Sequence, residues 1–225
     1  MKTLKPLALV VALLVLGSAA ASAQQTMQFN GTVTGYNDGH YYVGTYLASY
    51  YPTGPQIDVF CVDFNHEISN GQIWTANFSN LATSNLSQTR LGLAGWSYAN
   101  SLVTYQSEAW LASQFANPLY HDNNDWVGIA HAMWYVTSGN GGLIDSYSTP
   151  WITAVASAQL GGFTGMDFSQ WSLITDVNAK GEAANGDGTQ EFLTHTVTPE
   201  PATLLLFGTG LLLLVGVGFV KRSAA

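Results

Sequence analysis

The sequence predicts an α+β fold: a β-rich, sheet- or sandwich-like body with a helical insertion, followed by a C-terminal transmembrane helix. Two observations predict the body. Apolar and aromatic residues alternate with polar ones between residues 26 and 78, and again after residue 162, as is typical of strands. Between about residues 87 and 158 the apolar residues recur at helical spacing instead. Strands, then helices, then strands in large blocks favour one α+β domain over residues 24–197.

Residues that favour turns divide the first predicted β region, residues 26–78, into separate strands. Asn37-Asp38-Gly39 lies between two tyrosine-rich runs and predicts a hairpin. The segment from Ile57 to Phe64 alternates as a strand, so Cys61 shares a face with Val59, and Phe60 lies on the other face. The pattern leaves open which face meets the core. Further strands are predicted over residues 72–78, 172–177 and 191–197.

Several residues between about 87 and 158 predict where helices begin and end. Ser107-Glu108 is expected to open one helix, which Pro118 ends. Asn124-Asp125 opens the strongest predicted helix, and Gly139 is its expected C-terminal stop. Thr149-Pro150 places proline at the first position of a further predicted helix. The insertion is therefore expected to consist of several amphipathic helices.

Residues 1–23 have the pattern of a secretory signal peptide. Lys2 and Lys5 form the positive region, an apolar run follows over residues 7–16, and Ala21 and Ala23 provide a small-residue cleavage site. The apolar run is too short to be a stable membrane span. We therefore expect export through the Sec translocon and a mature chain that begins at residue 24.

The C-terminal end has the pattern of a membrane anchor. The run over residues 202–220 carries no charge, and as a helix rising about 1.5 Å per residue it would cross a hydrocarbon core of roughly 30 Å. Pro199 and Pro201 cannot lie within a continuing helix, so they mark the start of the span. Lys221 and Arg222 form a basic end that is expected to remain on the cytoplasmic side.

The same tail resembles a family signal. Pro199, Glu200 and Pro201, followed at once by a Leu/Gly-rich span and a short basic end, are similar to the PEP-CTERM sorting signal of Gram-negative bacteria. The resemblance covers residues 198–225 and implies processing near the tripeptide by an exosortase, a membrane protease. It implies an inner-membrane-anchored precursor whose body is then released to, or attached at, the cell surface. Such a protein would belong to the extracellular matrix or biofilm.

The charge of the body limits its partners. Residues 24–197 hold two basic and thirteen acidic side chains, a net charge of −11. Nucleic acid is therefore excluded as an expected partner, because almost nothing would neutralise phosphate. A neutral glycan or a divalent cation suits this surface better, although an acidic exterior also serves solubility alone. The seven Trp and eleven Tyr of the chain could form a platform for glycans, but their periods favour core packing.

Two short motifs resemble bacterial surface thioester domains. These motifs are the strand around Cys61 and the helical run that ends at Ala132-Met133-Trp134. In that family a glutamine two residues before the alanine joins the cysteine. The matching position here is Ala130, which has no amide, so no thioester is expected. What the resemblance implies is a scaffold in which strands around Cys61 pack against the helix over residues 126–134.

Cys61 also raises the alternative of a surface cysteine hydrolase. A nucleophilic thiolate would need a histidine partner, either His131 or His66, and an exposed, electropositive position. Cys61 lies within a predicted strand of an acidic chain, so a buried core thiol is favoured over a reactive one. We therefore expect no catalytic residues, no cofactor and no enzymatic activity.

A second alternative is a cation-dependent adhesin-like module. Asp122, Asn124 and Asp125 follow His121 in a short oxygen-rich segment, and such oxygens suit Ca²⁺. The same residues are also typical of a helix cap with Asx-turns, which is the favoured interpretation. The expected role is thus a non-enzymatic surface or matrix protein associated with exopolysaccharide or the envelope.

Overall fold

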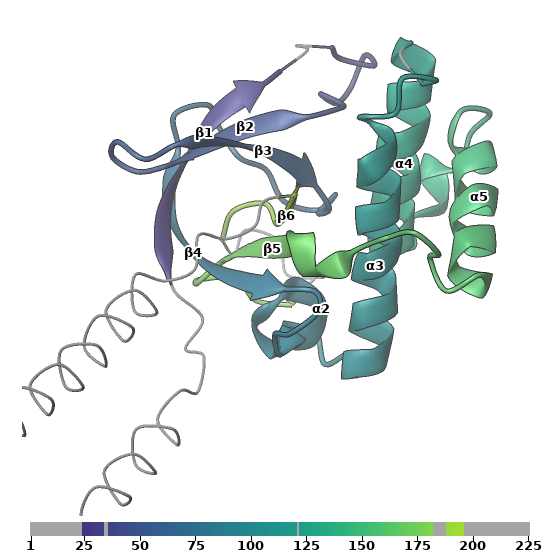
Figure 1. Cartoon of the computed structure of the whole chain (residues 1–225). Helices are drawn as coiled ribbons and strands as arrows, with labels where there is room; N and C mark the ends of the chain where they lie inside the picture. The colour runs from purple at the N-terminus through teal and green to yellow at the C-terminus, as the bar shows by residue number, and fades with distance from the viewer. Residues whose placement is uncertain (1–23, 34–35, 121, 182–187, 196–225) are drawn as a thin grey trace, which may run out of the picture.

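The computed structural model describes residues 24–33, 36–120, 122–181 and 188–195. Its strands form one closed antiparallel barrel in the order β1-β2-β3-β6-β5-β4 (Figure 1). The strands are β1 (Gln25–Thr32), β2 (Tyr46–Tyr50), β3 (Gln56–Cys61), β4 (Ile73–Asn80), β5 (Trp171–Asp176) and β6 (Phe192–His195).

The barrel confirms the α+β body but corrects the expectation of a sandwich-like sheet. β1 pairs with both β2 and β4, and β6 lies between β3 and β5, so each of these six strands has two neighbours. Alternation along a strand indicates which side chains share a face, but not whether the two edges of the sheet meet. Closure depends on the pairing of β4 with β1, which are separated along the chain by two other strands.

The helical insertion lies between β4 and β5, as predicted. Its α-helices are α2 (Arg90–Leu93), α3 (Tyr98–Gln114), α4 (Asn123–Ser138) and α5 (Ser148–Leu160). Figure 1 shows α3, α4 and α5 together on one side of the barrel. α4 packs against both α3 and α5 and also contributes side chains to the core of the barrel.

The predicted start of α3 is wrong. The helix begins at Tyr98, where the side chain of Ser97 accepts a hydrogen bond from the N–H of Asn100. Ser107 lies within the helix and donates its hydroxyl to the carbonyl of Val103, 2.8 Å away. A serine that bonds the preceding turn in this way is compatible with a helix interior. The residue type alone did not distinguish a serine within a helix from a serine that caps its N-terminus.

Both ends of α4 agree with the sequence. Asp122 caps the first turn, and its Oδ1 accepts from the N–H of Asp125 at 2.8 Å. Gly139 ends the helix in a left-handed conformation with φ 68°. Glycine adopts this conformation without the steric clash that a Cβ atom would cause. The predicted end of the helix at Gly139 is therefore confirmed.

Two apolar clusters cover the two faces of β3. Val59 and Cys61 belong to the barrel interior, whereas Phe60 and Val62 pack toward the helices. Both faces therefore meet a core, which explains why alternation could not select one of them. Trp134 of α4 joins the interior cluster, and its Nε1 donates to the carbonyl of Cys61 at 3.2 Å. The expected packing of this helix on the strand around Cys61 is confirmed.

The predicted signal peptide and the C-terminal sorting segment lie outside the described residues. Among the residues that the structure does describe, no helix has the length and apolar character needed to cross a membrane. The predicted hairpin is described and confirmed in part of its length: Asn37 bridges Tyr42, and the N–H of Asp38 donates to the carbonyl of Tyr41 at 3.0 Å.

Candidate functional site

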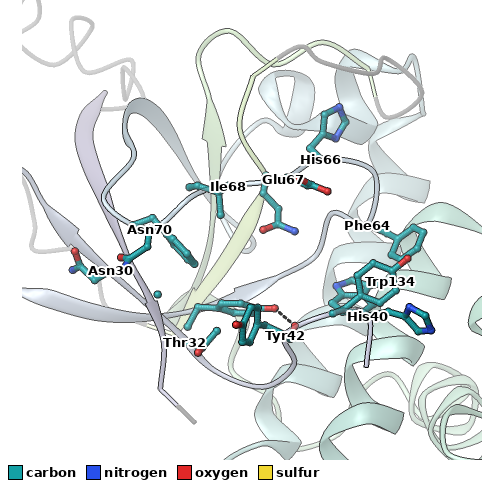
Figure 2. A pocket seen from close by; sticks show the side chains of 15 residues that line it. Asn30, Thr32, His40, Tyr42, Phe64, His66, Glu67, Ile68, Asn70 and Trp134 are labelled. Atoms are coloured by element: carbon teal, nitrogen blue, oxygen red, sulfur yellow. Dashed lines mark hydrogen bonds between the residues drawn. The ribbon is translucent and has the colours of Figure 1, made fainter. Parts of the chain in front are cut away.

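A pocket of about 650 Å³ lies at one end of the barrel. Its walls come from the end of β1, the hairpin over residues 36–43, the start of β2, the segment after β3, and α4. Figure 2 shows two unlike walls: the aromatic rings of Phe64 and Trp134 on one side, and the amides of Asn30 and Asn70 on the other. The pocket therefore presents stacking surfaces and hydrogen-bonding groups to the same space.

The aromatic wall combines fixed and exposed rings. Tyr41 packs edge-on against Phe64 and Trp134, with ring centroids 5.2 Å and 5.6 Å apart. Tyr41 nevertheless keeps 43% of its surface exposed, and Tyr42 keeps 54%. These two exposed rings are neighbours in the chain and both line the same pocket, so together they present an aromatic surface to it. Tyr46 lies deeper and donates its hydroxyl to the carbonyl of Tyr42, which ties the wall to β2.

A β-bulge directs the amide wall. Phe29 pairs with Ala48 and Gly31 pairs with Leu47, so Asn30 is an extra residue in β1. Gly31 adopts φ 95°, which suits glycine at a bulge. Bulges commonly re-aim side chains beside functional sites. Nδ2 of Asn30 donates to Ser49 Oγ at 3.1 Å, so this amide is already oriented.

The pocket is acidic or neutral along its described lining. Glu67 is its carboxylate, Gln190 adds a third amide, and Thr32 adds a hydroxyl. No lysine or arginine is among the residues that line it in the described part of the chain. Nε2 of Gln190 donates to the carbonyl of Asp63 at 3.0 Å, which holds this side chain in place. The lining therefore suits an uncharged ligand rich in hydroxyl groups.

His66 connects the pocket to a buried ionic network. Its Nδ1 lies 2.8 Å from Asp63 Oδ1, and its Nε2 lies 3.1 Å from Nη1 of Arg90. A guanidinium only donates hydrogen bonds, so Nε2 of His66 must accept. Nδ1 then carries the proton and donates to Asp63. This assignment makes His66 a neutral imidazole, held rigidly between a carboxylate and a cation.

His131 lies outside the pocket lining and joins two acidic segments. Its Nδ1 is 2.7 Å from Oδ2 of Asp145, and its Nε2 is 2.9 Å from Oδ2 of Asp38. Burial by itself raises the pKa of Asp38, but hydrogen bonds from the N–H groups of Tyr41 and His40 and from His131 hold it below its ordinary value. These contacts fix the hairpin against α4.

The pKa of Asp145 is lowered in a similar way. Burial opposes the shift, whereas the N–H groups of Ser148 and Tyr147 and the side chain of His131 favour the carboxylate. Two ionised carboxylates therefore face one imidazole. A ring with a carboxylate at each nitrogen is best satisfied as an imidazolium, which donates from both.

The structure buries Cys61 inside the barrel. Its thiol donates to the carbonyl of Asp63 at 3.3 Å. Burial raises the pKa of the Cys61 thiol well above its usual range, and the Asp63 carboxylate raises it further. His66 and His131, the two histidines considered as partners, both have their ring nitrogens bonded to other groups.

The calcium candidates lie at the start of α4. Asp122 uses Oδ1 to cap the helix, while Asn124 and Asp125 belong to its first turn. These three residues also line a smaller hollow of about 350 Å³ with Tyr147 and Trp151. His121 lies outside the described residues. Within the described ranges, no three His, Cys, Asp or Glu side chains are grouped so as to hold a metal ion.

Sequence reasoning missed the pocket and the pairing of His131. It considered a glycan platform but favoured core positions for the aromatics. The available signal was the hairpin at Asn37-Asp38-Gly39, because tyrosines that directly follow a tight turn often remain partly exposed. Asp38 and His131 are 93 residues apart, so no local pattern joins them.

A protein-family model matches the C-terminal end of the chain. Residues 197–222 match the PEP-CTERM protein-sorting motif. The motif implies an exported protein, made as a membrane-associated precursor and sorted to the cell surface with processing by an exosortase. Pro199, Glu200, Pro201, Lys221 and Arg222 fall within the matched range. Residues 1–23, with the predicted cleavage site at Ala21 and Ala23, are outside both the match and the described structure.

Searches of curated proteins and of solved structures give no match to this chain. The resemblance of the body to bacterial surface thioester domains therefore gains no support. The local geometry agrees with the expected packing alone: Ala130 and Cys61 belong to one buried cluster, but alanine offers no group for a bond.

Proposed function

We propose that the chain is an exported, non-enzymatic surface protein that binds uncharged extracellular polysaccharide in the pocket at the barrel end. The observation that carries the proposal is the pairing of exposed tyrosines with an amide wall across one space. A volume of about 650 Å³ is within the range of ordinary small-ligand sites, so it would accommodate a short segment of a polymer.

The chemistry of the two walls suits a sugar ring. A pyranose has apolar C–H faces and a rim of hydroxyl groups. The exposed rings of Tyr41 and Tyr42 provide flat apolar surfaces at a small cost in side-chain entropy. The amides of Asn30, Asn70 and Gln190 can each donate to and accept from hydroxyl groups.

Charge supports an uncharged polymer over a polyuronate or a sulfated glycan. The body carries a net charge of −11 over residues 24–197. Glu67 adds a carboxylate to the pocket itself. An anionic polymer would be repelled both by the net charge of the body and by Glu67 in the pocket. At low ionic strength, salt would screen this repulsion only weakly. Uncharged chains would avoid this cost.

The state of Cys61 supports a binding role over hydrolysis. A nucleophilic cysteine needs an accessible thiolate beside a base. Cys61 is 4% exposed, and the pKa of its thiol is raised by burial. The two candidate bases, His66 and His131, already bond to carboxylates or to Arg90. The export implied by the sorting motif also supports a role at the cell surface, where such polymers occur.

The test uses protein purified from the producing cells and the extracellular polysaccharide of the same cells. Mobility in affinity gels would be compared with and without the polysaccharide, and also with alginate as a polyanionic probe. Tyr42→Ala removes an exposed ring from the aromatic wall, and Asn70→Ala removes an amide from the amide wall. Tyr51→Ala is the matched control, because Tyr51 is 45% exposed but follows β2 at the other end of the barrel.

We expect retardation of the wild type by the cell's own polysaccharide. Loss of one exposed ring should weaken binding by roughly tenfold, the equivalent of about 1.4 kcal/mol. Tyr51→Ala should behave as the wild type. Equal retardation of all four proteins, or retardation by alginate alone, would contradict the proposal.

A further inference from the structure

The hairpin that forms the pocket rim is attached to the rest of the molecule through Asp38. Oδ1 of Asp38 accepts from the N–H groups of His40 and Tyr41, each at 2.7 Å. Oδ2 of the same carboxylate contacts Nε2 of His131 on α4 at 2.9 Å. One side chain therefore shapes the turn and joins it to the helix. His40, Tyr41 and Tyr42 of this hairpin all line the pocket.

A second carboxylate anchors His131 from the opposite side. Oδ1 of Asp145 accepts from the N–H groups of Tyr147 and Ser148, each at 2.7 Å, at the start of α5. Its Oδ2 contacts Nδ1 of His131 at 2.7 Å. The imidazole thus links the hairpin, α4 and α5, and its side chain is 13% exposed.

Both contacts at once require a doubly protonated ring. A neutral imidazole has one N–H and can donate to one of the two carboxylates, while its other nitrogen presents a lone pair to the second. The titratable groups that face His131 are Asp38 from the hairpin and Asp145 from the segment before α5. The ring of Trp134 lies beside it, with centroids 5.7 Å apart.

We propose that His131 is the positioning residue of the pocket: its imidazolium bridges Asp38 and Asp145 and thereby holds the hairpin, and polysaccharide binding weakens when the ring loses its proton. This inference rests on the proposed function for its binding consequence. Its structural part, the pinning of residues 36–43, stands without any ligand.

The charges of His131, Asp38 and Asp145 determine the direction of the expected pH dependence. A doubly protonated ring donates to both carboxylates, which are ionised because the pKa values of Asp38 and Asp145 are below the ordinary range. When the ring is neutral, one charge-assisted bond is lost and a carboxylate faces a lone pair. The hairpin then moves more freely, and the aromatic wall is no longer held in its binding position.

The first readout needs no ligand. Amide hydrogen exchange of residues 36–43 would be measured from pH 5 to pH 9 and corrected for intrinsic exchange rates. Protection in the wild type should fall about tenfold across this range, the equivalent of one charge-assisted hydrogen bond. His131→Gln should show low protection at every pH. His195→Gln is the matched control, because His195 is exposed and bonds to Gln170 on the far side of the barrel.

The second readout is affinity for the polysaccharide of the producing cells over the same pH range. We expect the wild type and His195→Gln to lose affinity together with protection, and His131→Gln to be weak throughout. If His131→Gln fails to fold, Asp38→Asn replaces it. Its carbonyl can still accept from the hairpin N–H groups, but it presents no anion to His131, so the pH profile should become flat.

The outcomes separate the two proposals. Wild-type protection that does not change with pH, or a His131→Gln profile equal to the wild type, would overturn the inference. If protection changes as expected but the polysaccharide never binds, His131 positions the hairpin and the proposed function is wrong. If binding occurs and is independent of pH, the proposed function stands and His131 has no positioning role.

Discussion

Nε of Arg90 lies 2.6 Å from Oδ2 of Asp63, and both side chains are fully buried. Nη2 of Arg90 also donates to the carbonyl of Thr189 at 2.6 Å. The pair therefore connects three parts of the chain: the segment after β3, the start of the helical insertion and the segment before β6. It also sets the neutral state of His66 at the edge of the pocket.

Removing the cation of this pair should strongly destabilise the fold. Arg90→Met leaves the carboxylate of Asp63 buried without its partner, and such losses cost about 3–5 kcal/mol. The free energy of unfolding from urea titration would measure it. Lys180→Met is the control, because it removes the same charge from an exposed position and should change stability by less than about 0.5 kcal/mol. Adding Asp63→Asn to Arg90→Met should recover part of the loss, and a decrease below 1 kcal/mol for Arg90→Met would contradict this account.

Gly128 allows the close approach of α4 and α5. A Cβ at this position would lie 2.3 Å from the carbonyl oxygen of Tyr147 and 2.7 Å from Cδ1 of Trp151. Gly128→Ala should therefore cost about 1–3 kcal/mol through overpacking, despite the better helix propensity of alanine. Gly141→Ala is the matched control, since its added carbon would meet no heavy atom within 4 Å apart from the adjoining backbone. A thermal melt of both variants would decide, and equal midpoints would show that α5 moves aside freely.

Glu191 should make stability depend on pH in a way opposite to the ordinary surface carboxylates. Burial raises the pKa of Glu191 above 4.5, although Thr175, Tyr105 and the N–H of Arg90 donate to it. The folded state therefore keeps a proton that the unfolded chain releases, so this contribution is complete below pH 4.5 and declines as pH rises through the folded-state pKa.

The experiment compares the wild type with Glu191→Gln. The difference in free energy of unfolding, wild type minus variant, should decrease as pH rises above 4.5 and then become constant. Asp38→Asn provides the opposite sign, because the pKa of Asp38 is lowered and its contribution is lost as pH falls through the folded-state value. A wild-type minus Glu191→Gln difference that increases with pH would refute the assignment.

Cys61 should resist alkylation in the native protein. Its thiol is buried and its pKa is raised well above the usual range, so thiolate is scarce and the reagent has no access. Iodoacetamide at pH 8 should label the native protein at least about a hundredfold more slowly than the urea-unfolded protein, since labelling then requires opening of the barrel. Mass spectrometry would follow the reaction. Fast labelling of the native protein would revive the alternative of a cysteine hydrolase.

Local sequence patterns predicted much of the secondary structure. Alternation identified β3, β4, β5 and β6 to within a few residues, because a strand with a buried face must repeat every second residue. Gly139 predicted the end of α4 since a left-handed residue favours glycine. The start of α3 was missed because Ser107 and Ser97 look alike in sequence, and the difference is the acceptor that each one finds.

The candidate site was less predictable than the fold. Asn37-Asp38-Gly39 indicated the hairpin, but not that its tyrosines would face Asn30 and Asn70 across a pocket. That relation depends on a bulge in β1 and on the closure of the barrel, both of which are pairings between distant residues. The aromatics were assigned to the core because composition and period do not distinguish a ring at a barrel end from one inside it.

The sequence alone determined the block order of strands and helices, the acidic body and the sorting motif over residues 197–222. These properties depend on neighbours along the chain, and so a linear pattern contains them. Only the tertiary structure decided that β4 meets β1, that Arg90 is buried beside Asp63, and that His131 lies between Asp38 and Asp145. Each of these contacts joins residues that are distant in sequence, and the packing of the whole chain selects them from many chemically equivalent partners.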